Sequence, residues 1–284
     1  MSNKDKILEL ESISLQVRRD IVRMVNMAKS GHPGGSLGCA DMMTALYFYA
    51  MNIDINKPIQ ETNGEDLFFL SNGHISPLLY SVLARRGYFP ISELAGFRKL
   101  GSRLQGHPTP SHGLPGIRIA SGSLGQGLSV AVGAAYAKKY DQDSSLVYVM
   151  TGDGELQEGQ NWEAIMFAAS HKIDNLIAIV DYNNVQIDGK LEEVISLGDL
   201  EKKWIAFGWE VLKGNGNKMQ EVVSMLDQAK SRTGKEKPVV ILMRTEMGMG
   251  VDFMMGSSKW HGVAPNDEQT EIALQQLPET LGDF

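Results

Sequence analysis

The chain has 284 residues, of which 43% are hydrophobic and 21% are charged, so it can bury a large core as one large domain or two small ones. Its formal net charge of −7 and the absence of a Lys/Arg run argue against nucleic-acid binding, and a single cysteine, Cys39, excludes a disulfide framework and a cysteine-based metal site. The charged, amphipathic N-terminus is unlike a signal peptide and no apolar run approaches the roughly 18 residues of a membrane span, so we expect a cytoplasmic protein without a membrane segment.

Hydrophobic periodicity predicts mostly helices in the first half of the chain. Apolar residues at helical spacing indicate a long helix over residues 6–29, which Gly31 and Pro33 bring to an end. The elements expected after it are a helix over 36–50, a short buried strand at 67–70, helices over 76–86 and 91–99, a Gly/Pro-rich loop over 101–118 and a small-residue helix over 122–140. A loop of this length is uncommon in a compact domain, which favours a functional role for it.

Strands and helices alternate in the second half of the chain. The expected elements are strands at 146–150 and 176–180 with a helix between them, a helix over 199–207, a strand at 209–213, a helix over 217–230, a strand at 238–244 and a helix over 267–277. This alternation predicts an α/β fold with a doubly wound, mostly parallel sheet and helices on both faces. Since no repeat and no interdomain linker is evident, we expect one domain over 1–284, with a helical N-terminal extension over about 1–50.

The segment 152–184 carries the strongest functional signal. The strand at 146–150 runs into Gly152-Asp153-Gly154, and the strand at 176–180 runs into Asp181-Tyr-Asn183-Asn184. Both strand ends of a parallel sheet open at one edge, so Asp153 and Asn183 could direct two oxygens at one Mg²⁺, which usually completes its shell with ligand phosphates. The glycines allow close approach of a diphosphate, and the N-terminus of the following helix favours an anion. The alternative is two ordinary turns in an α/β sheet.

Four of the six histidines lie in Gly/Pro-rich loops, namely His32 in SGHPGG, His74 in SNGH, His107 in QGHPTP and His261 in WHGVAP. A single loop histidine is usually a surface or capping residue. Four histidines in such loops are harder to explain in that way. We interpret them as candidate catalytic residues, since imidazole suits proton transfer near neutral pH.

Taken together, these motifs resemble the N-terminal half of transketolase, a thiamine diphosphate (ThDP) enzyme whose cofactor motif pairs GDG with an Asn pair. The resemblance covers essentially the whole chain. It rests on residues 30–38, 71–74, 106–108, 122–129, 152–159, 181–184 and 261–262. It implies the ThDP-binding fold, and within it the diphosphate-binding domain, supplied as a separate N-terminal subunit of a split transketolase.

The resemblance implies a role for each matching residue. Asp153 and Asn183 would bind Mg²⁺ through their side chains and Val185 through its backbone carbonyl, with Ca²⁺ or Mn²⁺ as possible substitutes. The residues implied to bind ThDP are His74, Gly122, Leu124, Gly154, Glu158, Asn183 and His261. Gly154 would offer its amide to the diphosphate, and Leu124 would pack near the thiazolium ring. The catalytic residues implied, which would line the substrate channel and contact the donor, are His32, His107 and His261.

Other positions match the family less directly. Glu158 and Glu163 match carboxylates that link the two active sites at the family's dimer interface, and the alternative for both is a solvated helix face. Position 123 is Ser where many members have Pro, and position 184 is Asn where some have Lys; neither change bears directly on the expected chemistry. His112 and His171 match no family role, and we expect them to be structural or surface residues.

The resemblance also implies what a partner must supply. In transketolase the second domain carries the glutamate that activates the aminopyrimidine ring of ThDP, the aromatic pocket for that ring and most arginines that bind the sugar phosphate. The sequence ends in Gly282-Asp283-Phe284 after an amphipathic helix, which we interpret as a finished end. We therefore expect a C-terminal partner subunit carrying the pyrimidine-binding domain, in an α₂β₂ assembly.

The implied reaction is transfer of a two-carbon ketol unit from a ketose phosphate to an aldose phosphate, as in the pentose phosphate pathway. One alternative is the α-type subunit of a ThDP-dependent 2-oxo acid dehydrogenase E1, which shares GDG and the Asn pair but does not need SGHPG or SNGH. A second is a ketolase specialised for an unusual sugar phosphate. A third is a non-catalytic subunit of the same fold, against which the intact Asp153, Asn183 and four loop histidines argue.

Overall fold

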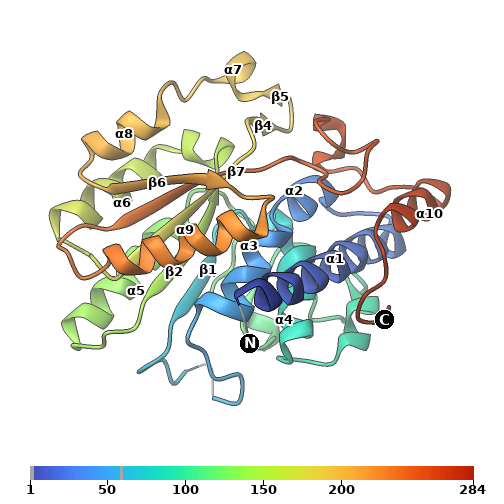
Figure 1. Ribbon diagram of the computed structural model, residues 1–284, viewed down its shortest axis with the longest axis horizontal. Helices are drawn as coiled ribbons and strands as arrows, with labels where there is room; N and C mark the ends of the chain where they lie inside the picture. The colour runs from blue at the N-terminus through green and yellow to red at the C-terminus, as the bar shows by residue number, and fades with distance from the viewer. Residues whose placement is uncertain (1–2, 58–59) are drawn as a thin grey trace.

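The computed structural model describes residues 3–57 and 60–284, which are built around a five-stranded sheet in which all neighbouring strands are parallel (Figure 1). The strands are β1 (Leu67–Leu70), β2 (Val147–Gly152), β3 (Leu176–Tyr182), β6 (Glu210–Asn215) and β7 (Val239–Arg244), in the order β1-β2-β3-β7-β6. The central strands are continuous apolar runs, which is typical of strands covered on both faces. The predicted α/β fold with a mostly parallel sheet is confirmed.

Helices cover both faces of the sheet, and alternate residues of each strand point to opposite layers. One layer contains α1 (Asn3–Ala28), α2 (Pro33–Gly38), α3 (Ala40–Ala45), α4 (Ser76–Arg86) and α9 (Met219–Arg232), and the other contains α5 (Gly127–Tyr140), α6 (Gly159–Ser170) and α8 (Leu200–Ala206). Phe68 and Tyr148 belong to the core of the first layer, whereas Phe69 and Val149 belong to the core of the second. The N-terminal helices α1 to α3 thus contribute directly to the core under the sheet.

The other elements of the described residues are short. They are the π-helical turn η1 (Leu46–Ala50), the 3₁₀ turns η2 (Gly73–Ile75), η3 (Ile91–Gly96), η4 (Pro110–His112), η5 (Gly154–Gln157) and η6 (Ser258–His261), the antiparallel ribbon β4 (Val185–Gln186) and β5 (Gly189–Lys190), and the helices α7 (Leu191–Val194) and α10 (Asp267–Gln276). Within residues 3–57 and 60–284, no helix has both the length and the apolar character needed to cross a membrane.

The helix predicted over 36–50 has different limits in the structure. It begins at Pro33, because proline lacks an N–H that the first helical turn would leave unpaired anyway. It is interrupted at Cys39, whose ψ of 3° is not helical. At the preceding residue, a Cβ on Gly38 would lie 2.9 Å from the carbonyl oxygen of Glu246, so the backbone here packs directly against a distant loop. The prediction of one uninterrupted helix was therefore wrong.

Two more predicted helices were too long. The segment 91–99 forms only the 3₁₀ turn η3, because Arg98 adopts a left-handed conformation (φ 57°) and its N–H bonds the carbonyl oxygen of Leu104. The helix predicted over 122–140 begins at Gly127, because Gly125 has φ 82°, outside the helical region. Residues 122–126 are therefore a loop.

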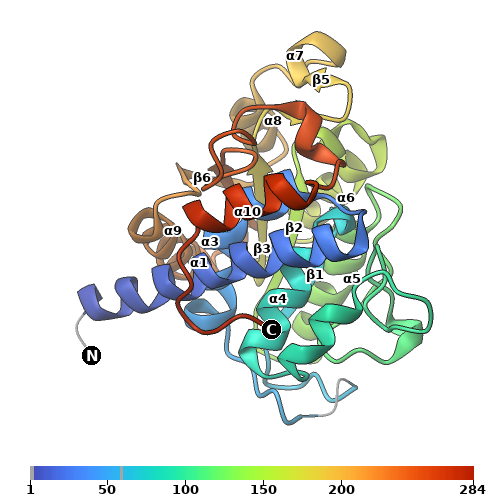
Figure 2. The same ribbon diagram turned by 90° about the vertical axis from the view of Figure 1, so that its right-hand side faces the viewer.

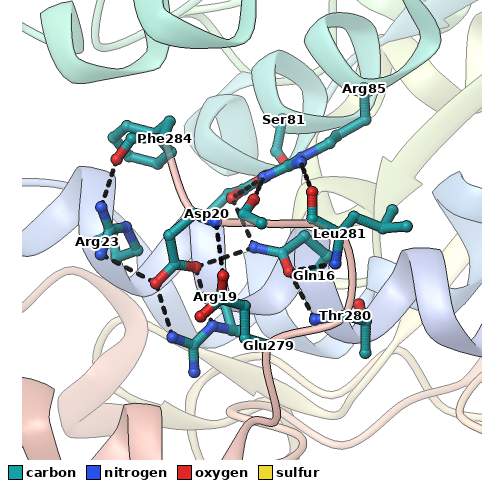
Figure 3. A network of polar contacts seen from close by, with 12 residues as sticks. Gln16, Arg19, Asp20, Arg23, Ser81, Arg85, Glu279, Thr280, Leu281 and Phe284 are labelled. Carbon is teal, nitrogen blue, oxygen red and sulfur yellow. Dashed lines mark hydrogen bonds and ion pairs between the residues drawn. The ribbon is translucent and has the colours of Figure 1, made fainter.

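The C-terminal segment of the chain packs against α1. Figures 1 and 2 show α10 running beside α1, and the following segment turns across α1 towards α4. A polar network holds that segment in place (Figure 3). The Asp283 carboxylate accepts hydrogen bonds from Arg19 Nη2 at 2.7 Å and from Arg23 Nη1 at 3.1 Å. Arg85, on α4, donates to the carbonyl oxygen of Gly282 at 2.8 Å and pairs with the buried Asp20.

We expect Asp283→Asn to destabilise the folded chain, because Arg19 and Arg23 lose a charged acceptor. Loss of such a hydrogen-bonded partner costs about 1–3 kcal/mol. The hydrogen bond from Arg19 lowers the pKa of Asp283 to about 2, so its contribution is complete above the ordinary aspartate pKa of about 4 and is lost as the pH falls from there towards 2. Urea unfolding at pH 7 and at pH 3 measures this difference. Asp141→Asn, at an exposed site, is the matched control, and equal midpoints for all three proteins at pH 7 would contradict the assignment.

Candidate functional site

The carboxyl ends of β1, β2 and β3 open at one edge of the sheet. The loop 71–74 follows β1, the loop 152–154 follows β2, and the loop 181–184 follows β3. Gly152 pairs in register with Asp181, so the two loops that carry Asp153 and Asn183 are neighbours. Ligands of open α/β sheets bind at this edge.

A pocket of about 420 Å³ lies at this edge. Of the residues predicted to bind cofactor or metal, those lining it are His74, Leu124, Asp153, Gly154, Glu158, Asn183, Val185 and His261. The pocket also contains residues for which the sequence predicted no role, among them Glu155, Asp181 and the apolar Ile187 and Ile195. It therefore combines buried polar side chains with exposed apolar ones, as small-molecule sites commonly do.

Two buried carboxylates lie at the bottom of the pocket. Asp153 is 2% exposed; its Oδ1 accepts the N–H of Gly154 at 2.8 Å and its Oδ2 that of Asn184 at 2.5 Å. Burial, followed by the charge of Asp181, raises the pKa of Asp153 to about 8. Burial also raises the pKa of Asp181. A divalent cation bound here would favour the ionised carboxylates, so the site fits a metal ion.

The other implied metal ligands lie beside them. Asn183 Nδ2 donates to Asp181 Oδ2 at 3.0 Å, which orients the amide, and Asn183 Oδ1 accepts the N–H of Val185 at 2.8 Å. Among the residues that the structure describes, no three His, Cys, Asp or Glu side chains are arranged to hold a metal by themselves. One carboxylate, one amide oxygen and one backbone carbonyl form an incomplete oxygen set, which suits Mg²⁺ shared with the phosphates of a ligand.

The four loop histidines form a cluster next to the carboxylates. His32 precedes α2, His74 lies in η2, His107 in the loop 101–118 and His261 in η6. The ring centroid of His32 is 5.3 Å from that of His74, 5.9 Å from that of His107 and 5.7 Å from that of His261, and the rings of His74 and His261 are 5.0 Å apart. Four segments separated by up to 229 positions (261 − 32) thus meet at one point.

Burial lowers the pKa of all four histidines, to about 4 for His32, where His261, Arg98 and His107 add to the effect. The rings are therefore neutral at pH 7, and each carries one donor and one acceptor nitrogen. The Nδ1 atoms of His32 and His261 are buried and have no hydrogen-bond partner within the described ranges. Such atoms cost stability unless a ligand satisfies them, so the cluster suits a ligand rich in hydroxyl or carbonyl oxygens.

Of the remaining residues considered from the sequence, one lies at the histidine cluster and three lie outside it. Gly122 lies at the cluster, where a Cβ on it would be 3.7 Å from the Cβ of His107. Glu163 is exposed on α6. His112 and His171 are exposed and take no part in the histidine cluster. His171 stacks on Phe167 with ring centroids 3.9 Å apart.

Sequence reasoning missed the structural importance of Glu155 and Asp181. Both belong to motifs that were recognised, and both are almost fully buried, Asp181 near the end of β3 and Glu155 in η5, just after β2. An acidic residue directly after Gly152-Asp153-Gly154 was a usable signal, because such a residue must find hydrogen-bond donors if the preceding loop is buried. Which donors it finds is a property of the fold.

Comparisons with known proteins agree with this geometry. The family model described as "Transketolase, thiamine diphosphate binding domain" matches residues 11–280. The chain is 40% identical to one subunit of the apulose-4-phosphate transketolase of Phocaeicola vulgatus over 277 residues, which is 96% of each protein. It is also 40% identical to the SqwG subunit of the 6-deoxy-6-sulfo-D-fructose transketolase of Clostridium sp. (strain MSTE9), over 94% of this chain and 97% of that protein.

Among solved structures, a transketolase from Campylobacter jejuni superposes with a TM-score of 0.87 at 34% identity, over 98% of this chain and 43% of the other. The chain thus spans less than half of that enzyme, but nearly all of the two subunits named above. The resemblance inferred from the motifs is confirmed: the chain belongs to the family of transketolase thiamine diphosphate binding domains.

Proposed function

We propose that the chain is the N-terminal subunit of a split transketolase, which transfers a two-carbon ketol unit from a ketose phosphate to an aldose phosphate together with a C-terminal partner subunit. The observation that carries this proposal is the cluster of His32, His74, His107 and His261 beside Asp153 and Asn183. A 2-oxo acid dehydrogenase E1 subunit shares the GDG and Asn motifs but does not need these histidine loops. Two relatives of the same length are named as transketolase subunits, which supports the same choice.

Different site residues would bind the metal ion, the diphosphate and the thiazolium ring of the cofactor. Asp153 and Asn183 side chains and the Val185 carbonyl would hold Mg²⁺, while the Gly154 N–H, His74 and His261 would contact the diphosphate. Leu124, which is 38% exposed at the pocket, would pack near the thiazolium ring, and Gly122 and Glu158 would complete the binding surface. Bound ThDP supplies the carbanion chemistry, for which the protein provides orientation and electrostatics.

The neutral histidines would act on the substrate. His32, His107 and His261 can each donate a hydrogen bond to a hydroxyl or carbonyl oxygen of the donor and accept one on the other ring nitrogen. An imidazole held neutral can take up a proton as a substrate hydroxyl loses one, and can return it later. The Nδ1 atoms of His32 and His261, which have no hydrogen-bond partner among the described residues, support this role.

The partner surface would lie on α5 and α6. Val130, Tyr136, Met166 and Phe167 are 43%, 45%, 57% and 42% exposed, and the rings of Tyr136 and Phe167 are in edge contact. Large exposed apolar side chains on two neighbouring helices favour an interaction site here. Glu163 lies on α6 with Met166 and Phe167. This position supports its implied place at the interface between the two halves of an α₂β₂ assembly. We further propose that residues 1–284 form one domain and that the protein is cytoplasmic.

The donor would be a specialised ketose with an anionic group, because one relative is named for a sugar phosphate and the other for a sugar sulfonate. The test is a turnover assay of the chain assembled with its partner subunit, using xylulose 5-phosphate, apulose 4-phosphate and 6-deoxy-6-sulfo-D-fructose as separate donors with an aldose phosphate acceptor. We expect ketol transfer from at least one donor. Decarboxylation of pyruvate without ketol transfer from any of them would overturn the proposal in favour of an E1-type subunit.

The histidine cluster makes a separate prediction. In His32→Ala and His107→Ala, ThDP binding should survive, whereas turnover should fall about 10²–10⁴-fold, because a positioned proton donor is lost. His112→Ala, an exposed loop histidine outside the cluster, is the matched control and should keep full activity. Steady-state kinetics together with calorimetric ThDP titration separates the two effects. Full turnover in both cluster variants would show that these are ordinary loop histidines.

A further inference from the structure

Glu155 is a buried acid whose hydrogen bonds come from three separate loops. Glu155 is the second residue of η5, directly after Gly154, and it is 2% exposed. Its Oε1 accepts the N–H of Gly125 at 2.8 Å and the hydroxyl hydrogen of Ser71. Its Oε2 accepts the N–H of Gly152 at 3.0 Å. All three contacts use the side chain as an acceptor, a role that suits a carboxylate because it has no N–H or O–H that would need an acceptor of its own.

Each of these loops carries part of the proposed cofactor site. Ser71 opens the loop that ends in His74, Gly125 lies one residue after Leu124, and Gly152 directly precedes Asp153. The Ser71 hydroxyl also accepts the N–H of Gly127 at 3.0 Å, which links the first turn of α5 to the same carboxylate. One side chain therefore joins the segments that position His74, Leu124 and Asp153.

The backbones of these loops are in direct contact. A Cβ on Gly73 would lie 2.0 Å from the carbonyl oxygen of Ser121, and a Cβ on Gly127 would lie 2.5 Å from the Cβ of Ser71. Asn161 Nδ2 donates to the backbone oxygen of Glu155 at 2.7 Å, which ties η5 to α6. With no room between the loops, a shift of one must move the others.

A neutral amide cannot replace this carboxylate. Glutamine presents an oxygen on one side and an NH₂ group on the other, so one of the present donors would face another donor. A buried donor without an acceptor costs free energy, and hydrogen bonds to an ionised carboxylate are about twice as strong as neutral ones. The three loops thus depend on the charge of Glu155 and not only on its shape.

We propose that Glu155 is a positioning residue that fixes the three loops relative to one another before cofactor binds, so that His74, Leu124 and Asp153 face one ligand. Its effect on ThDP binding rests on the proposed function. Its effect on the loops does not, because the contacts lie within this chain.

The test compares Glu155→Gln with Asp66→Asn. Asp66 is also a buried carboxylate, 5% exposed, and accepts the N–H groups of Asn52 and Leu146 at 2.8 Å each, but it precedes β1 at the opposite end of the sheet. Amide hydrogen exchange of the cofactor-free chain, resolved by NMR, should be about tenfold faster or more at Gly125, Gly127 and Gly152 in Glu155→Gln. In Asp66→Asn the change should be confined to the region of Asn52 and Leu146.

Kinetics of the chain assembled with its partner subunit gives the second measurement. For Glu155→Gln the Kd of ThDP should rise about tenfold or more, while kcat at saturating ThDP should fall far less, because no group that contacts the substrate is lost. Asp66→Asn should leave the Kd of ThDP unchanged. Ser71→Ala removes one of the three hydrogen-bond donors without altering a charge, and it should also speed amide exchange at the same glycines. This variant replaces Glu155→Gln in the test if Glu155→Gln does not fold.

Unchanged exchange at the three glycines in Glu155→Gln, or in Ser71→Ala where that variant serves instead, would overturn the proposal. An equal rise in the Kd of ThDP for Glu155→Gln and Asp66→Asn would also overturn it, because that result indicates general destabilisation. If the wild-type assembly binds no ThDP, the proposed function fails, and the exchange experiment still decides the role of Glu155 in the loops.

Discussion

Replacing Asp153 by Ala should abolish Mg²⁺-dependent binding of ThDP by the assembled enzyme. Asp153 is the one carboxylate in the proposed metal set, and the other two donors are an amide and a backbone carbonyl, which carry no charge. A cation shared with a diphosphate needs the anionic ligand to offset the cost of its lost hydration. The variant chain should still fold, because it loses a buried carboxyl whose ionised form is disfavoured by burial and by the charge of Asp181.

Calorimetric titration of ThDP with and without Mg²⁺ measures this effect, and thermal unfolding without cofactor checks the fold. Asp188→Ala is the matched control, because it removes an exposed carboxylate from the same pocket. That variant should bind ThDP as the wild type does. Unchanged ThDP affinity in Asp153→Ala would show that the cation, if one binds, is held elsewhere.

Most of the sheet could be predicted from sequence because β1, β2, β3 and β7 are short apolar runs bounded by glycine or polar residues. The order of β6 and β7 could not. The chain places β7 between β3 and β6, and this depends on how α9 packs under the sheet rather than on any local pattern. The helix limits failed for a related reason. Gly125 and Arg98 adopt positive φ values that suit contacts with distant residues, and local propensity does not report such contacts.

The site was largely predictable because its residues lie in motifs with recognisable spacing. Motif spacing does not predict the pKa shifts of the four histidines. These shifts arise because segments far apart in the sequence are buried together. Motif spacing also does not predict the role of Glu155, because its three hydrogen-bond donors lie up to 84 positions away in the sequence. The motif identifies the residue, and only the fold shows which loops it joins.

The largest expected effect concerns the chain as a whole. The proposed pocket would hold only the diphosphate end of ThDP, because the resemblance to transketolase implies that a second domain carries the ring-activating glutamate and the aminopyrimidine pocket. Bound ThDP would supply the chemistry, and that glutamate would be one of the protein groups that tune it. The 284-residue chain should therefore show no ketol transfer by itself, and the exposed face of Val130, Tyr136, Met166 and Phe167 should make it prone to self-association.

The most direct measurement is a ketol-transfer assay of the chain by itself, of the C-terminal partner by itself and of their mixture, each with saturating ThDP and Mg²⁺. Mass measurement of the mixture is made in parallel, and a mixture containing Asp153→Ala is the inactive control. We predict activity only in the wild-type mixture, with a mass that corresponds to two copies of each protein. Robust ketol transfer by the 284-residue chain without its partner would contradict the proposed half-site, because it would show that this chain carries a complete active site.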